Sequence, residues 1–559
     1  MRLRSFHTMV ACLVLVLSGI TSTVTAQTPL HQQIDQLIAE GKPQFEKQAA
    51  PLADDATFLR RVTLDLTGTI PTADEVRTFV ADSSPDKRSQ RIDQLLASPE
   101  HARRLQYLFD TMLMERRPGK YVKTAEWEEY LRQSFLENRP WDELVHEILT
   151  VDGTDKTTRP AARFLLDREL KSEVVTRDLG RIFLGRDLQC AQCHDHPNVN
   201  DYLQRHYHGL DAFLSRSYLF KDPKTKQTSI GEKAEGQVSF TSVFTKEEGM
   251  TAPRVLDLPE IPDPADAKKA YKVKPAKNVR SVPVYSRRLQ LADALTSQHN
   301  EAFQKNIVNR LWAMMMGQGL VEPLDMWHSD NPPTHPKIVS LLSEELANHE
   351  FNLRYVIREL ALTQTYQRSS HVLAETEIPE RSAYQMGLLK PLTPEQLAWS
   401  MMQATGVTSA TLERLQAKQR KVDEKQKTKK ADAPLWQEEA LHDALKGNVA
   451  AFVRTFGIVG AQTTRFDASA DQALFLLNGN TIQAWLAPSG NQLTVRLKKL
   501  DQPTDIAEEL YLSVFSRFPT ETEIKQVALF LEGGPKPTDQ DLQQLIWAAL
   551  SSDEFRFNH

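Results

Sequence analysis

The chain has 559 residues, of which 40% are hydrophobic and 25% are charged. This mixture can bury sizeable cores and excludes a wholly disordered acidic or basic tail. The formal net charge of −5 provides no global positive field, so we do not expect nucleic acid as a partner. Three cysteines are too few for a disulfide-stapled scaffold. At about 150 residues per domain, the length predicts three or four compact units.

The first 26 residues have the layout of a secretory signal peptide. Two arginines near the start precede an apolar run at 10–20, and small residues lead to Ala26, after which we predict cleavage. About ten apolar residues are too few to span a hydrocarbon core of ~30 Å. Cleavage removes Cys12 and leaves two cysteines in an exported chain, periplasmic or extracellular. Because no later apolar stretch approaches about 18 residues, we expect no membrane span in the mature chain.

The first half of the mature chain, 27–220, is predicted to be a helical domain. Apolar residues recur at helical spacing, and Thr72 to Glu75 form a capping box that opens a helix. A second capping box is predicted at Thr520 to Glu523. In this first domain we predict helices at 54–66, 87–115, 124–149 and 170–188.

A change of composition follows Phe220. Residues 221–285 are rich in proline, lysine and other polar residues, and 236–245 alternate like a short strand. We interpret this stretch as a linker with a small β element, followed by a second helical domain at 286–559. The predicted fold class is therefore mainly α, with two helical domains. In the second domain we predict helices at about 286–318, 336–367, 393–405, 436–455, 468–487, 502–516, 520–533 and 538–555.

One segment of the second domain has a strong charge bias. Residues 413–430 hold eight basic and three acidic side chains. Such a segment can be an interaction arm for an anionic polymer or surface, or a solvated helix or loop insertion. The absence of aromatic residues and of a glycine-rich RNA-binding pattern favours the solvated insertion.

Both cysteines of the mature chain lie in the motif Cys190-Ala191-Gln192-Cys193-His194. C-x-x-C-H is the attachment pattern of c-type haem, in which two thiols add to the porphyrin vinyl groups and the adjacent histidine coordinates the iron. One turn of chain between the thiols matches the separation of the vinyl groups. We therefore predict that Cys190 and Cys193 hold haem c and that His194 is its proximal ligand.

Two other chemistries use the same residues. Two cysteines so close together can form a disulfide or a redox-active thiol pair, although no βαβ pattern surrounds them as in a thioredoxin-like module. A zinc site could combine both thiolates with His196 and with His206 or His208. Neither cysteine nor His194 distinguishes these possibilities, so the cofactor is haem c, zinc or none.

A six-coordinate haem also needs a second axial ligand, which Met or His supplies. His206 and His208 lie on a helix-like stretch at 202–214, close enough in sequence to fold back over a haem. His196, Met326 and His328 are further candidates. Each histidine by itself is more often a surface or hydrogen-bonded residue.

The loop at 328–336 of the second domain is a further candidate site. His328, Asp330 and His335 could form a metal or acid–base cluster. The structural interpretation is favoured, because paired prolines set a rigid turn and Thr334 can cap a helix that begins at Pro336. No hydrolase, protease or nucleotide-binding motif is present, so no catalytic residue is predicted.

Several longer motifs resemble one family, the secreted planctomycete cytochrome c-like proteins that pair two domains of unknown function, numbered 1549 and 1553. The first domain is suggested by FLRRVTLDLTGTIPTADEV (58–76), KRSQRIDQLLASPEH (87–101), GRIFLGRDLQCAQCHDHP (180–197) and HGLDAFL (208–214). The second is suggested by 306–336, ALTQTYQRSS (361–370), LTPEQLAWSM (392–401), QALFLLNGN (472–480) and SSDEFRFNH (551–559).

This resemblance implies an exported protein whose first domain is similar to a cytochrome c. Relatives usually continue the motif as His-Pro-Phe-Asp-x-Trp, whereas this chain has His196-Pro197-Asn198-Val199-Asn200 and so lacks two aromatic residues that would pack a haem edge. We expect an electron-transfer or other redox role, with a C-terminal domain that binds a redox or cell-surface protein. The alternative is a secreted binding or scaffold protein in which the motif is a disulfide or a zinc clip.

Overall fold

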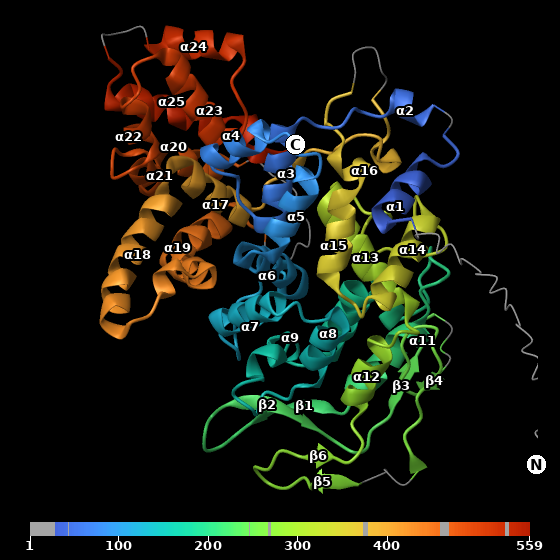
Figure 1. The fold of residues 1–559 in the computed structure, drawn as a ribbon. Coiled ribbons are helices and arrows are strands. Elements are labelled where there is room, and N and C mark those ends of the chain that lie inside the picture. The colour runs from blue at the N-terminus through green and yellow to red at the C-terminus, as the bar shows by residue number, and fades with distance from the viewer. Residues whose placement is uncertain are drawn as a thin grey trace, which may run out of the picture.

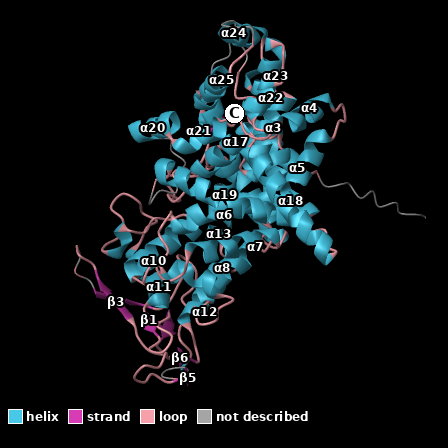
Figure 2. Cartoon of the chain, turned by 90° about the vertical axis from the view of Figure 1, so that its left-hand side faces the viewer, coloured by secondary structure: helices cyan, strands magenta, loops and turns pink. Residues whose placement is uncertain are grey.

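The computed structural model describes residues 28–559 except 43, 245, 247, 266–269, 373–377, 459–468 and 532–535. The predicted signal peptide lies outside the described residues. The fold is mainly α, as predicted, and the strands of the described residues form two-stranded antiparallel pairs (Figure 1). Figure 2 shows that β1, β3, β5 and β6 gather at one end of the molecule, away from α20 to α25.

Helices of the first domain begin and end at residues that local chemistry selects. Asp54 accepts a hydrogen bond from the backbone N–H of Thr57 at the start of α3, and Gly68 ends that helix in the left-handed region, with φ of 78°. The predicted capping box of Thr72 and Glu75 is confirmed at the start of α4. The helices are α1 (Leu30–Ala39), α2 (Phe45–Gln48), α3 (Asp55–Thr67), α4 (Ala73–Ala81), α5 (Lys87–Ala97), α6 (Pro99–Met114), α7 (Thr124–Leu136), α8 (Trp141–Thr150), α9 (Arg163–Leu166), α10 (Ser172–Asp178) and α11 (Gln204–Leu214).

Three predicted helices of the first domain are divided in the structure, and three of the second domain, 286–318, 336–367 and 468–487, are divided as well. The stretch 87–115 becomes α5 and α6, and 124–149 becomes α7 and α8. Pro99 and Pro140 lie at these two breaks, because a proline lacks the backbone N–H that a continuing helix needs and disfavours helical geometry in the residue before it. The third, 170–188, contains α10 and a π-helical turn at Leu179–Phe183.

Residues 217–283 carry the β structure. The register of the first hairpin pairs Ser217 with Glu232, and the second pairs Val238 with Thr251. The predicted strand at 236–245 corresponds to β3, which is shorter than expected. The strands are β1 (Ser217–Lys221), β2 (Thr228–Glu232), β3 (Val238–Thr241), β4 (Glu248–Thr251), β5 (Tyr271–Val273) and β6 (Val282–Pro283).

The second half returns to helices and ends in a small sheet, in which β7 (Lys390–Pro391) pairs with β8 (Phe557–Asn558) at the C-terminus. The predicted capping box of Thr520 and Glu523 is confirmed by reciprocal hydrogen bonds. The helices are α12 (Arg287–Leu295), α13 (Glu301–Met316), α14 (Pro336–Asn348), α15 (Leu353–Leu362), α16 (Gln364–Gln367), α17 (Pro394–Thr405), α18 (Val407–Gln426), α19 (Pro434–Phe456), α20 (Ala470–Asn478), α21 (Asn480–Leu486), α22 (Leu493–Lys498), α23 (Pro503–Val514), α24 (Glu521–Leu531), α25 (Asp539–Ser551) and α26 (Asp553–Arg556).

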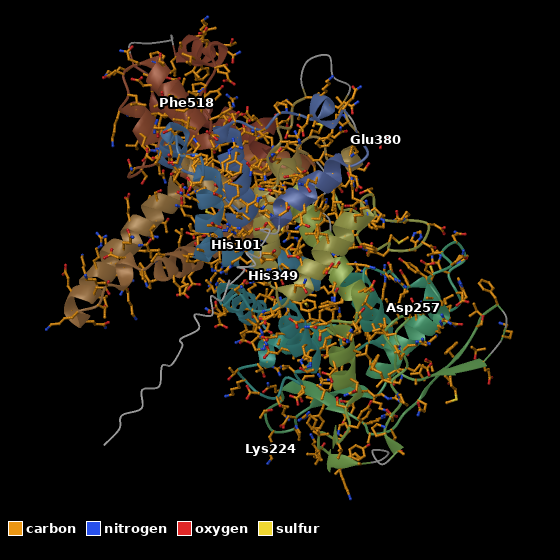
Figure 3. All side chains as sticks on the ribbon, turned by 45° about the vertical axis from the view of Figure 1, so that its right-hand side comes forward. His101, Lys224, Asp257, His349, Glu380 and Phe518 are labelled. Carbon is orange, nitrogen blue, oxygen red and sulfur yellow. The ribbon has the colours of Figure 1, made fainter. Side chains whose placement is uncertain are left out.

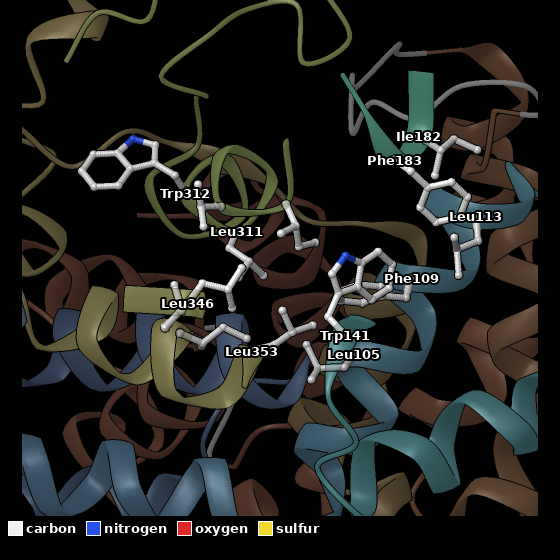
Figure 4. Packing of buried hydrophobic residues seen from close by; sticks show 14 of the residues in the cluster. Leu105, Phe109, Leu113, Trp141, Ile182, Phe183, Leu311, Trp312, Leu346 and Leu353 are labelled. Carbon is white, nitrogen blue, oxygen red and sulfur yellow. The ribbon is translucent and has the colours of Figure 1, made fainter. Parts of the chain in front are cut away.

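Two hydrophobic cores organise these elements. The first joins α1 to α11 with α12 to α16, so helices from both halves of the sequence share it. Trp141 is buried in this core and stacks on Phe303 with ring centroids 6.2 Å apart. It also packs edge-on against Phe109 (Figure 4). The second core contains residues of α17 to α26, together with Leu64 and Ile70 from the first domain. The two cores therefore divide the molecule near residue 390.

His101 provides a test of burial in the first core. This histidine lies on α6 and is 1% exposed, and its Nδ1 lies 2.8 Å from the carbonyl oxygen of Leu66 (Figure 3). Burial lowers the pKa of His101 to about 4. An unfolded histidine titrates near 6.5, so the unfolded chain binds more protons between pH 6.5 and pH 4. The stabilisation from neutral His101 is therefore complete above pH 6.5 and is lost as the pH falls through this window.

We expect His101→Gln to make the free energy of unfolding less dependent on pH. Its slope between pH 6.5 and pH 4 should differ from that of the wild type by about 1.4 kcal/mol per pH unit. Urea unfolding of both proteins at several pH values measures this difference, and other titrating groups cancel in the comparison. Parallel pH profiles for the two proteins would contradict the prediction.

Candidate functional site

The C-x-x-C-H motif lies on a short 3-10 turn at Cys190–Gln192. Buried Leu188 and Ala191 anchor the turn, and the backbone N–H of Gln189 donates to the Asp187 carboxylate at 3.1 Å. Cys190 and Cys193 are both exposed and form no disulfide in the described part of the chain. The turn therefore presents both thiols to solvent from a backbone that is fixed beneath them.

His194 is oriented by its own main-chain neighbour. Its Nδ1 lies 2.6 Å from the carbonyl oxygen of Asp195. Because a carbonyl oxygen only accepts, Nδ1 donates this hydrogen bond, and in the neutral imidazole Nε2 then keeps the lone pair that a metal ligand needs. In a ligating histidine, a hydrogen bond from the ring nitrogen that does not bind the metal usually fixes the tautomer and the ring orientation. His194 thus has the protonation pattern of an axial ligand.

The β3–β4 hairpin approaches this motif from outside. The backbone N–H of Val243 donates to the carbonyl oxygen of Cys193 at 3.2 Å, and the ring of Phe244 lies 4.6 Å from that of His194. Val243, Phe244 and Met250 of the hairpin are exposed. Aromatic and apolar side chains therefore lie beside the motif, although residues 198–200, directly after Pro197, include no aromatic residue. The alternating pattern predicted a strand but held no signal for where it would pack.

His206 and His208 lie on α11, which packs against the motif. Nε2 of His206 is 2.9 Å from Asp257 Oδ1, and its Nδ1 accepts from the backbone N–H of Leu203 at 3.4 Å (Figure 3). Nε2 of His208 donates to the carbonyl oxygen of Gln192 at 3.1 Å, and its ring stacks on Phe240. Burial lowers the pKa of both imidazoles. His208 thus links α11 to the motif, and His206 links α11 to Asp257. Both ring nitrogens of His206 already have a hydrogen-bond partner.

A loop of the second domain also reaches the motif. The backbone N–H of Asp187 donates to the carbonyl oxygen of Asp325, and Met326 pairs with Arg186 as an isolated β-bridge. The structure therefore brings Met326, which is distant in sequence, close to the residues just before Cys190.

A row of rings continues from the motif to this loop. The ring of Tyr202 packs edge-on against His196, with centroids 5.8 Å apart, and against His328, with centroids 5.9 Å apart. Tyr202 is fully buried. Sequence reasoning missed Tyr202, Asp257 and Phe244, because a lone tyrosine, aspartate or phenylalanine carries no motif of its own.

The candidate cluster of His328, Asp330 and His335 does not share one environment. His328 packs on Tyr202, whereas the ring of His335 lies 5.5 Å from Tyr384 and burial lowers its pKa to about 4. Helix α14 begins at Pro336, as predicted. The predicted cap is wrong, because the N-cap residue is His335, without a side-chain hydrogen bond, and the backbone N–H of Thr334 donates to Leu320 instead.

A cavity of about 410 Å³ lies next to Trp327 and His328. Arg186 and Asp257 line it from the first half of the chain, and Trp327 and His328 line it from the second. Among the residues that the structure describes, no group of three or more His, Cys, Asp or Glu side chains could hold a metal ion. No helix in the described ranges is long and apolar enough to cross a membrane.

Comparison with protein families assigns both halves of the chain. Residues 33–218 match the family described as a protein of unknown function (DUF1549), and residues 287–531 match the family described as a protein of unknown function (DUF1553). The two matches show that this chain pairs these two domains. The first match contains the motif, and the second begins at the first residue of α12. Neither the curated proteins nor the solved structures contain a match to the chain.

Proposed function

We propose that this chain is an exported c-type haem protein that transfers single electrons, similar to the planctomycete cytochrome c-like proteins. Cys190 and Cys193 would attach the porphyrin through thioether bonds, and His194 would be the proximal ligand. The observation that carries the proposal is the pair of exposed thiols on one turn, followed at once by an imidazole whose Nε2 is left as an acceptor.

The donor set fits haem c. Thioether formation adds each thiol across a vinyl group, and both thiols are accessible for that reaction. The hydrogen bond from His194 Nδ1 to Asp195 holds the imidazole in one orientation and raises its basicity as a ligand. The bound haem iron would supply one-electron chemistry by changing between its ferrous and ferric states.

The side chains around the motif would tune this group. Val243 and Phe244 would exclude water from its edge, and a drier, less polar site alters the reduction potential. His196, His206, His208 and Met326 stay candidates for the second axial ligand. His206 could serve only after it releases Asp257 or Leu203, so His196, His208 and Met326 would need smaller changes. The DUF1553 domain would bind a redox or cell-surface protein.

Covalent haem is the test of this proposal. We expect the chain, exported to the periplasm of a host with cytochrome c maturation, to keep its Soret band after extraction with acidic acetone. Cys190→Ala with Cys193→Ala should lose that band completely, because no thioether can form. Lys224→Ala, at an exposed turn of the β1–β2 hairpin, serves as the control and should keep it. A colourless wild-type protein from this host would falsify the proposal.

The same exposed thiols also favour the second candidate, a secreted binding or scaffold protein. In that case an oxidising compartment would join Cys190 to Cys193, or zinc would bind them once His196, His206 or His208 moves within reach. This candidate requires a protein without visible absorbance. Thiol titration would then find no free thiol, or elemental analysis would find zinc.

A further inference from the structure

The charge-biased segment at 413–430 forms most of a projecting helix and the turn that follows it. Helix α18 extends away from the body of the molecule beside α19 (Figure 1). Four basic side chains on α18 are separated by four, three and four residues, a spacing that places them on one face. All four are exposed. We call Arg414, Lys418, Lys421 and Lys425 the basic stripe, and at 1.5 Å per residue it is about 16 Å long.

The opposite face of α18 contacts the turn at 427–433, which leads from α18 back to α19. Nε2 of Gln416 donates to the carbonyl oxygen of Ala431 at 3.3 Å. Asp423 is buried and accepts from the backbone N–H of Ala431 at 2.9 Å and from the hydroxyl of Thr428 at 2.6 Å. These contacts order the turn without any residue of the basic stripe. The stripe is therefore free for a partner on an already ordered helix.

The stripe differs from an ordinary solvated helix surface. Such surfaces intersperse both signs of charge, and like charges three or four residues apart repel each other and destabilise the helix. Among the described residues of 407–433, the ion pair that a basic side chain forms joins Arg420 to Asp432, outside the stripe. Exposed Lys427, Lys429 and Lys430 extend the positive charge to the tip. Solvent and salt screen this repulsion in part, and an extended polyanion would neutralise the charges directly.

The remaining surface of α18 indicates the kind of polyanion. Residues 407–430 contain no aromatic side chain on which a nucleic acid base could stack. All residues of α18 are described, and Val422 is its one exposed large hydrophobic residue. The helix therefore has no apolar face that could enter a bilayer. Recognition would rest on a row of charges alone, which suits a flexible chain of acidic sugars.

We propose that the basic stripe binds an acidic polysaccharide, a linear polymer that carries carboxylate or sulfate groups. The sugar acids would lie along α18 and pair with the four basic side chains, and the tip lysines would add contacts. Binding would release counterions, so the affinity should fall steeply with salt. This inference is independent of haem, because α18 and the C-x-x-C-H motif are in different domains.

The experiment compares two fourfold variants that lose the same charge. One replaces the basic stripe by Arg414→Gln, Lys418→Gln, Lys421→Gln and Lys425→Gln. The control replaces four exposed lysines near the β hairpins, by Lys224→Gln, Lys226→Gln, Lys274→Gln and Lys277→Gln. Full-length proteins are titrated with heparin, which carries sulfate, and with alginate, which carries carboxylate, at about 0.15 M salt. Circular dichroism and the urea midpoint check that both variants stay folded.

We expect the wild type to bind at least one of the two polysaccharides. The stripe variant should bind it at least tenfold more weakly and show a smaller dependence of affinity on salt, and the control should change less than about twofold. Equal losses in both variants would overturn the proposal, because general charge would then explain binding. The proposal also fails if the wild type binds neither polymer, or binds duplex DNA or phosphatidylserine vesicles more tightly than both.

Discussion

Replacement of Asp65 by alanine is expected to destabilise the protein by about 3–5 kcal/mol. Asp65 is buried on α3, and its Oδ2 lies 2.6 Å from Lys390 Nζ and accepts from the Tyr366 hydroxyl at 2.8 Å. Its Oδ1 accepts from Nδ2 of Asn558 at 2.9 Å. Burial already lowers the pKa of Lys390. Without Asp65, this ammonium is buried without a counter-ion, the Tyr366 hydroxyl loses its acceptor, and Asn558 loses the shorter of its two hydrogen bonds.

Urea unfolding at pH 7 measures the loss. Asp74→Ala is the matched control, because the Asp74 side chain is 95% exposed on the neighbouring helix α4, and it should change stability by about 0.5 kcal/mol or less. Asp65→Asn combined with Lys390→Met removes both charges and should recover part of the stability. A loss below about 1 kcal/mol in Asp65→Ala would show that water or rearrangement replaces the carboxylate.

Removal of Glu438 is expected to have an effect of similar size in the second core. Nη1 of Arg103 donates to both carboxylate oxygens of Glu438, at 2.8 and 2.9 Å, and both side chains are at most 3% exposed. The guanidinium also lies 3.9 Å from the centre of the Trp399 ring. Glu438→Ala leaves Arg103 charged inside the protein, so we expect a loss of about 3–5 kcal/mol.

A double variant distinguishes the loss of the ion pair from the burial of one unpaired charge. Arg103→Met with Glu438→Met places two apolar side chains of similar length in the same space, and we expect it to be far more stable than Glu438→Ala. The pair joins α6 of the DUF1549 domain to α19 of the DUF1553 domain. If the double variant is as unstable as Glu438→Ala, the ion pair itself contributes net stability, contrary to our expectation.

Local signals explain how well the helices could be predicted. The capping boxes at Thr72 and Thr520 are confirmed, because a cap depends only on residues within one turn. Helix ends at Pro99 and Pro140 were missed where apolar spacing continued across them. The spacing of apolar residues does not reveal a break between two helices when the apolar residues of both helices follow one continuous pattern.

The candidate site was also predictable only in part. The motif at 190–194 was evident from residue types and spacing alone, and the comparisons support the pairing of DUF1549 with DUF1553 on which the resemblance rested. Its surroundings were not evident, because Phe244 and Asp257 come from segments about 50 residues later in the chain. Their positions depend on how the β hairpin packs on α11, and no local pattern encodes that packing.

The sequence by itself determined the helical class, the capping boxes at Thr72 and Thr520, the thiol and imidazole motif, and the charge bias of 413–430. Each of these depends on residues within a few turns, where backbone geometry alone relates sequence spacing to position. Only the tertiary structure decided that α12 to α16 share a core with the first domain, that Asp65 joins Lys390 and the C-terminal Asn558, and that a hairpin lies over the motif. These contacts join residues tens to hundreds of positions apart, and many pairings of that range satisfy the same local preferences until the whole core is packed.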